Sequence, residues 1–147
     1  MVLSFGQLYG VEDMIAQQSV IKSIFIVKST KSYSEAKEFA QKLAKKSGVR
    51  LDLRALKYNE EIMISHPRAE CDENGYAYPC YIARGRYDDG VYLSVEPSDA
   101  YEEFTKGYYI VVAASGEKVD KSLLNRIRHY VPDAYVKRTT VYMGCIH

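Results

Sequence analysis

The sequence predicts an α+β fold, in which a four-stranded antiparallel sheet carries two helices on one face. A strand–helix–strand pattern occurs twice, in residues 23–56 and in residues 107–144. Right-handed crossovers place both helices on the same side of the sheet, so its other face is expected to be open. The 147 residues fit one domain, residues 21–147, with an N-terminal extension, residues 1–20, and a β-rich insertion, residues 58–106.

The first unit begins with an apolar, β-branched segment, residues 23–30 (SIFIVKST), which is typical of a buried strand. Ser32 and Glu35 then fit a capping box, and apolar residues follow at helical spacing. Gly48 suits the left-handed position just after a helix. Residues 49–56 (VRLDLRAL) alternate between apolar and charged side chains, which predicts a strand with one solvent-exposed face.

The insertion is expected to contain short strands and one short helix. The segments EIMIS (61–65), CYIARG (80–85) and GVYLSVE (90–96) read as strands, and SDAYEEF (98–104) reads as the helix. Arg84 and Arg86 are expected to share one face of a hairpin, where pairing with nearby acidic residues is favoured over binding an anionic ligand.

The second unit repeats the order of the first. Residues 107–115 (GYYIVVAAS) form the expected strand, and residues 117–132 (EKVDKSLLNRIRHYVP) form a helix that ends at Pro132. Residues 134–144 (AYVKRTTVYMG) form the closing strand. Two such units in one sheet correspond to the ferredoxin-like arrangement.

Charge divides the chain at the same boundaries. Residues 31–57 carry eight basic and three acidic residues, residues 58–105 carry three basic and eleven acidic, and residues 106–147 carry seven basic and three acidic. The net charge of +1 argues against general nucleic-acid binding. No apolar run approaches the roughly 18 residues of a membrane span, and the N-terminal residues do not resemble a signal peptide, so export would imply that the signal had been removed.

Cys71 and Cys80 flank a segment with a strong turn dipeptide, Asn74-Gly75, so their backbones are expected to approach each other. A disulfide is favoured, and free thiols and then a metal site are the alternatives. A disulfide would place the protein in an oxidising compartment. Cys145 would then be a free thiol or part of an intermolecular bond.

No catalytic or cofactor motif occurs in the chain, so the protein is expected to be non-catalytic, without a cofactor or a metal ion. None of the three histidines, His66, His129 and His147, has a Ser or Cys partner in a recognisable motif. Paired carboxylates are more simply explained as solvated turn and helix charges than as a glycosidase pair. These pairs are Asp72-Glu73, Asp88-Asp89 and Glu102-Glu103.

Two segments, FIVKSTKSYSEAKEFAQKLAKKSGVRLDL and YYIVVAASGEKVDKSLLNRIRHYVPDAYVKR, resemble the two halves of a SPOR (sporulation-related repeat) domain. The first half matches best, through Phe25-Ile26-Val27, the helix opening Ser34-Glu35-Ala36, Leu43 and Gly48. The resemblance covers less than half of the chain. The second half has Ala114-Ser115-Gly116 where the family usually has Gly-Pro/Ser-Phe, and the insertion is far longer than the connection in the family.

The resemblance implies a bacterial, periplasmic module that binds peptidoglycan glycan strands on the open face of its sheet. Sugar rings would stack on tyrosine, and arginine and aspartate would hydrogen-bond to their polar groups. The residues expected to bind on this basis are Arg50, Asp52, Arg54, Tyr109, Tyr135 and Lys137.

The alternative is a protein–protein interaction module, such as an inhibitor or an immunity-type protein. The chain has 14 tyrosines, and the acidic insertion holds many of them. Acidic, tyrosine-rich surfaces bind basic partners through electrostatic steering and aromatic anchors. The residues expected in this interface are Tyr76, Tyr78, Tyr81, Tyr87, Tyr92 and Tyr101. A third hypothesis is a structural or oligomeric role.

Overall fold

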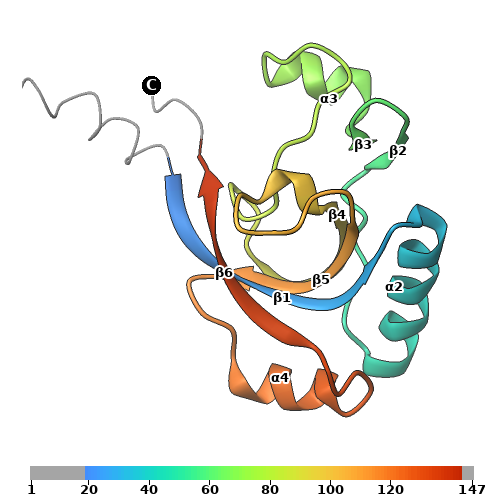
Figure 1. The fold of residues 1–147 in the computed structure, drawn as a ribbon, viewed down its shortest axis with the longest axis vertical. Coiled ribbons are helices and arrows are strands. Elements are labelled where there is room, and N and C mark those ends of the chain that lie inside the picture. Colours follow the sequence, from blue (N-terminus) through green and yellow to red (C-terminus); the bar gives the residue numbers. More distant parts are fainter. Residues whose placement is uncertain (1–18, 144–147) are drawn as a thin grey trace, which may run out of the picture.

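The computed structural model describes residues 19–143, and an antiparallel sheet of four strands lies at its centre (Figure 1). The predicted extension lies almost wholly outside the described residues, as do Cys145 and His147. The strands, in their order across the sheet, are β4 (Gly90–Pro97), β5 (Tyr109–Gly116), β1 (Ser19–Thr30) and β6 (Tyr135–Tyr142). Every neighbouring pair is antiparallel, which confirms the predicted α+β class and the four-stranded sheet.

The two longest helices within residues 19–143, α2 (Tyr33–Ser47) and α4 (Lys121–Arg128), pack on one face of the sheet. Ser32 caps α2 by accepting a hydrogen bond from the Glu35 amide (3.2 Å). The Glu35 carboxylate accepts from the Thr30 hydroxyl (2.9 Å), so it anchors the helix to β1. Gly48 ends α2 with φ at 76°, the left-handed conformation that glycine adopts without strain.

The predicted strand at residues 49–56 does not form, and β4 of the insertion occupies the edge beside β5 instead. Leu51 makes only an isolated parallel bridge to Leu93, through the Asp52 amide to the Leu93 carbonyl (2.8 Å) and the Leu93 amide to the Arg50 carbonyl (2.7 Å). The backbone then turns away at Arg54, whose φ is 57°. Alternation alone made both segments candidates for this edge, because each has one apolar face.

The second face of the sheet, expected to be open, is covered in part by the end of the insertion. Side chains alternate between faces along a strand, so Ile24 and Ile26 of β1 point away from the helices. Tyr101 and Phe104, which follow β4, pack against them, and neither is more than 7% exposed. Glu103 fastens this cover to β6, because its carboxylate accepts hydrogen bonds from Thr139 and Thr140.

The rest of the insertion lies at the end of the molecule opposite α4 (Figure 1). It contains a small hairpin, β2 (Lys57–Asn59) and β3 (Met63–Ser65), and the short helix α3 (Arg68–Glu73). The 3₁₀ helix η1 (Ser98–Ala100) follows β4 and leads into the cover over the sheet. The strand predicted at residues 80–85 is irregular chain, and the helix predicted at residues 98–104 is reduced to η1.

Replacing Leu93 with alanine tests whether β4 is part of the core. Leu93 is fully buried in the cluster between the sheet and the helices, so Leu93→Ala is expected to lower the free energy of unfolding by about 2–5 kcal/mol. Val91 on the same strand is 52% exposed, and Val91→Ala should cost under about 1 kcal/mol. Urea denaturation measures both, and equal losses would contradict the position of β4.

Candidate binding surface

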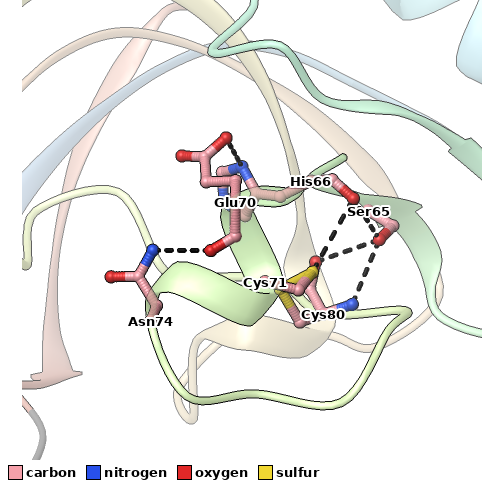
Figure 2. The surroundings of a disulfide bond; sticks show 6 residues. All are labelled: Ser65, His66, Glu70, Cys71, Asn74 and Cys80. Carbon is pink, nitrogen blue, oxygen red and sulfur yellow. Dashed lines mark hydrogen bonds and ion pairs between the residues drawn. A yellow bond between two sulfur atoms is a disulfide. The ribbon is translucent and has the colours of Figure 1, made fainter. Parts of the chain in front are cut away.

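A disulfide fixes the part of the insertion that contains α3. Cys71 on the helix and Cys80 on the returning chain are bonded, with their Cα atoms 5.8 Å apart, and this decides between the alternatives left open by the sequence (Figure 2). The His66 amide donates to the Cys80 carbonyl (2.9 Å), and the Cys80 amide donates to the Ser65 hydroxyl (3.1 Å). Together these bonds hold the exposed residues 72–78 as a closed loop, which we call the stapled loop.

Three of the tyrosines expected in an interface are exposed. Tyr76 and Tyr78 lie on the stapled loop and Tyr87 on the next turn, with exposed fractions of 38%, 41% and 71%. Arg86 Nη1 donates to the Tyr76 hydroxyl (2.6 Å), and the Arg86 guanidinium lies 4.8 Å from the Tyr87 ring centroid and 5.8 Å from that of Tyr142 on β6. Tyr76, Arg86, Tyr87 and Tyr142 therefore form one group on the surface, the tyrosine cluster.

The other tyrosines expected in the interface point inward, which corrects the prediction. Tyr92 is 4% exposed and Tyr101 is fully buried. The Tyr101 hydroxyl donates to the Arg84 carbonyl (3.1 Å), and the half-buried Tyr81 donates to the Glu96 carboxylate. Burial raises the pKa of all three tyrosines, so they stay neutral within the fold. They support the surface from below and are not available to a partner.

Arg84 is fully buried and joins the insertion to the sheet. Its guanidinium stacks on the Tyr92 ring at 3.5 Å from the centroid, and desolvation lowers its pKa. It donates at 2.8–3.0 Å to the carbonyls of Gly90, Tyr92 and Val112 and to the hydroxyls of Ser94 and Ser115. The expectation that Arg84 and Arg86 share a face is therefore wrong: Arg84 lies in the interior, and Arg86 reaches the surface.

Arg54, expected to bind glycan, is held by the protein itself. Its side chain is 9% exposed and pairs with the fully buried carboxylate of Glu96 and with Asp88 (Nε to Oδ2, 2.8 Å). Nη2 donates to the Ile82 carbonyl (2.8 Å). Burial opposes the charge of Arg54, but the neighbouring carboxylates outweigh it and raise the pKa. Arg54 therefore neutralises a buried carboxylate and has a structural role.

The structure does not bring the residues expected to bind glycan together. Arg50 and Asp52 form an exposed ion pair (3.1 Å) on the segment that runs outside β4. Tyr109 is buried on the helix face, where its hydroxyl donates to the Met63 carbonyl (3.2 Å). Tyr135 and Lys137 lie on the other face of the sheet. They line a hollow of about 200 Å³ together with Ser29, Ser98, Phe104, Thr105, Tyr108 and Ile110.

A cavity of about 210 Å³, which the sequence did not predict, lies beside the tyrosine cluster. Its lining residues are Arg54, His66, Glu70, Asn74, Ile82, Tyr87 and Asp88. The available signal was the short spacing between His66, which precedes α3, and Glu70 in the first turn of that helix. His66 Nδ1 lies 3.4 Å from Glu70 Oε2.

Within residues 19–143, no helix has the length and apolar character needed to cross a membrane. In the same part of the chain, no three His, Cys, Asp or Glu side chains are grouped closely enough to hold a metal ion. Comparison with protein-family models, curated proteins and solved structures found no match to this chain.

Removing the disulfide is expected to loosen the stapled loop and to leave the sheet intact. In the loop-entropy model, a bridge between residues nine apart contributes about 2–3 kcal/mol. Cys71→Ala/Cys80→Ala should lower the free energy of unfolding by that amount and speed amide exchange in residues 66–80, while β1 and β5 stay protected. Hydrogen exchange measures both effects. Three reactive thiols in denatured wild-type protein purified without reductant would contradict the bond.

Proposed function

We propose that the chain is a non-catalytic, extracytoplasmic binding module that binds a partner protein through the tyrosine cluster, as an inhibitor or immunity-type protein would. The observation that carries the proposal is the Tyr76–Arg86–Tyr87 contact at the surface. Tyrosine and arginine are the residue types that most often dominate binding energy in protein interfaces. Tyr87 in particular is 71% exposed although it carries a large aromatic ring.

The rigidity of the surface supports this proposal. Tyr76 belongs to a loop closed by a disulfide, and Tyr87 follows a turn that is anchored by Arg84. Side chains that are already ordered lose less conformational entropy when they bind, so their contacts contribute more to affinity.

Charge indicates the kind of partner. Asp72 and Glu73, exposed on α3, lie a few residues before Tyr76, and the exposed Asp89, two residues after Tyr87, pairs with Lys22. Residues 58–105 carry eleven acidic and three basic residues. Such a surface favours a basic partner, because complementary charge speeds association and disfavours acidic competitors.

The disulfide supports a location in an oxidising compartment, since such bonds are rare in the reducing cytosol. We propose further that this compartment is the periplasm. That expectation depends on the SPOR-like, ferredoxin-like resemblance of the sequence, which is itself part of the proposal.

A second candidate function is binding of peptidoglycan glycan, and the hollow at Tyr135 and Lys137 favours it. Tyr135 is 47% exposed and offers a ring for sugar stacking. Lys137 lies 4.9 Å from the Phe104 ring centroid, within reach of polar groups on a ligand. Tyr101, Phe104 and Glu103 occupy the neighbouring part of this face, so the room for a long glycan is smaller than an open sheet offers.

The protein-binding proposal is tested by affinity capture from an envelope extract of the source organism, followed by photo-crosslinking from position 87. Tyr87→Ala and Arg86→Ala should lower retention of the captured protein by about tenfold or more, because interface anchors of these types contribute about 2 kcal/mol or more. Tyr130→Ala is the matched control, because Tyr130 is 43% exposed but follows α4 at the opposite end of the molecule. Equal retention by Tyr87→Ala and Tyr130→Ala would contradict the proposal.

The glycan candidate is tested with purified sacculi before and after amidase treatment, which strips the stem peptides. Binding that rises after treatment and falls in Tyr135→Ala and Lys137→Ala would support it, since stacking and polar contacts would both be lost. Tyr130→Ala again serves as the control. A protein that does not bind amidase-treated sacculi has no such function.

A further inference from the structure

The cavity beside the tyrosine cluster lies between one side of α3 and the chain that leads into β4. Glu70 and Asn74 line it from α3 and the end of that helix, and Asp88 lines it from the chain before β4. Tyr87 lines it too and is highly exposed, so the cavity opens at the surface where we place the interface. We call it the anchor pocket.

His66 is the most unusual group in the anchor pocket. It is 3% exposed, and neither of its ring nitrogens has a hydrogen-bond partner among residues 19–143. Its ring stacks on Tyr81, with centroids 6.0 Å apart and planes at 12°, and it faces the Glu70 carboxylate (Figure 2). Buried polar atoms nearly always have a partner, so an unpaired imidazole that lines a cavity points to a ligand that supplies a donor.

The charges around the anchor pocket favour a cation. Arg54 lines it, but this arginine already pairs with Asp88 and Glu96. Glu70 adds a further carboxylate, whose side chain is 40% exposed and whose contact with His66 lacks hydrogen-bond geometry. The lining holds two carboxylates, Glu70 and Asp88, against one guanidinium, and the buried Glu96 carboxylate also contacts that guanidinium, so the net charge is negative. These side chains are not grouped closely enough to hold a metal ion, so an organic cation fits better.

We propose that the anchor pocket receives a lysine or arginine side chain of the partner protein. This inference rests on the proposed function and names the chemistry of its anchor. The side-chain cation would pair with Glu70 and Asp88, donate to the imidazole of His66, and lie against the ring of Tyr87 at the entrance. The stem of the side chain would be held in the cavity while the tyrosine cluster contacts the partner around it.

The test uses N-acetyl-arginine methylamide as the probe, titrated into the full chain and followed by the NMR signals of His66 and Asn74. We expect saturable shifts with a Kd of about 10 mM or tighter. The citrulline analogue keeps the shape and most of the donors but lacks the charge, and it should bind about tenfold more weakly or worse. The proposal is overturned by equal binding of the two probes, by the absence of saturable shifts, or by inorganic phosphate producing the shifts in their place.

Three variants locate the binding site. Glu70→Gln should weaken binding of the arginine probe about fivefold or more, because one charge-assisted contact is lost. Glu102→Gln, an exposed change elsewhere in the insertion, should leave it unchanged. His66→Phe keeps a ring against Tyr81 and removes two unpaired nitrogens, so it should fold with an unchanged or higher Tm and still weaken the probe. Unchanged probe binding in His66→Phe or Glu70→Gln would overturn the proposal.

The two proposals fail separately. If the arginine probe binds as predicted but Tyr87→Ala does not change capture of the partner, the tyrosine interface is refuted and the anchor pocket is retained. Capture that depends on Tyr87 but is unaffected by Glu70→Gln, in a chain that does not bind the arginine probe, refutes the anchor pocket and retains the interface.

Discussion

The burial of Arg84 is the constraint on which the arrangement of the insertion depends. A guanidinium without water must find hydrogen-bond acceptors, and an unpaired one would destabilise the fold severely. Arg84 finds them in the carbonyls and hydroxyls of β4 and β5, so the chain leading into β4 is fixed against the sheet. Gly85, with φ at 101°, then lets the backbone turn sharply, in a conformation that would strain a residue with a side chain. The turn brings Arg86 and Tyr87 to the surface directly after a fully buried residue.

A second arginine explains why β4, and not residues 49–56, lies beside β5. Any strand at this edge has one side facing the cover formed by Tyr101 and Phe104, where its polar groups lose water. The polar side chains of β4 on that side, Ser94 and Glu96, meet Arg84 and Arg54 respectively. Arg54 itself comes from the displaced segment, so that segment stays attached to the strand that replaced it. Of the two segments predicted as strands, β4 therefore forms the edge of the sheet, and residues 49–56 supply Arg54, which neutralises Glu96 of β4.

The sequence predicts those elements whose signals are local. The cap at Ser32, the left-handed Gly48 and the apolar runs of β1 and β5 lie within a few residues of the structure that they specify. The approach of Cys71 and Cys80 was also predictable. It is α3 and the turn after it that bring the two residues together, whereas the sequence suggested a hairpin.

The edge strand and the inner tyrosines were not predictable from local pattern. Residues 49–56 and 90–96 both alternate, and only distant partners decide between them. Tyr92 shares one face of β4 with Ser94 and Glu96, and this polar pattern predicts a solvent-exposed face. The face is nevertheless buried, because Arg84 and Arg54 bind its polar side chains. A tyrosine suits either environment, since it has an apolar ring and a polar tip.

The contacts that anchor the insertion also determine the shape of the candidate binding surface. Arg86 joins Tyr76, which the disulfide positions, to Tyr87, which the Arg84 turn positions, and to Tyr142 at the end of β6. The tyrosine cluster is therefore assembled from three separate segments of the chain, and each segment is anchored independently. A surface built in this way keeps its shape when no partner is present, so a partner would meet aromatic rings already in place. The cavity beside Tyr87 depends on the same anchors, because Glu70 belongs to the disulfide-bonded helix and Asp88 is held by Arg54. The contacts that hold the insertion in place thus also fix the geometry of its candidate binding surface.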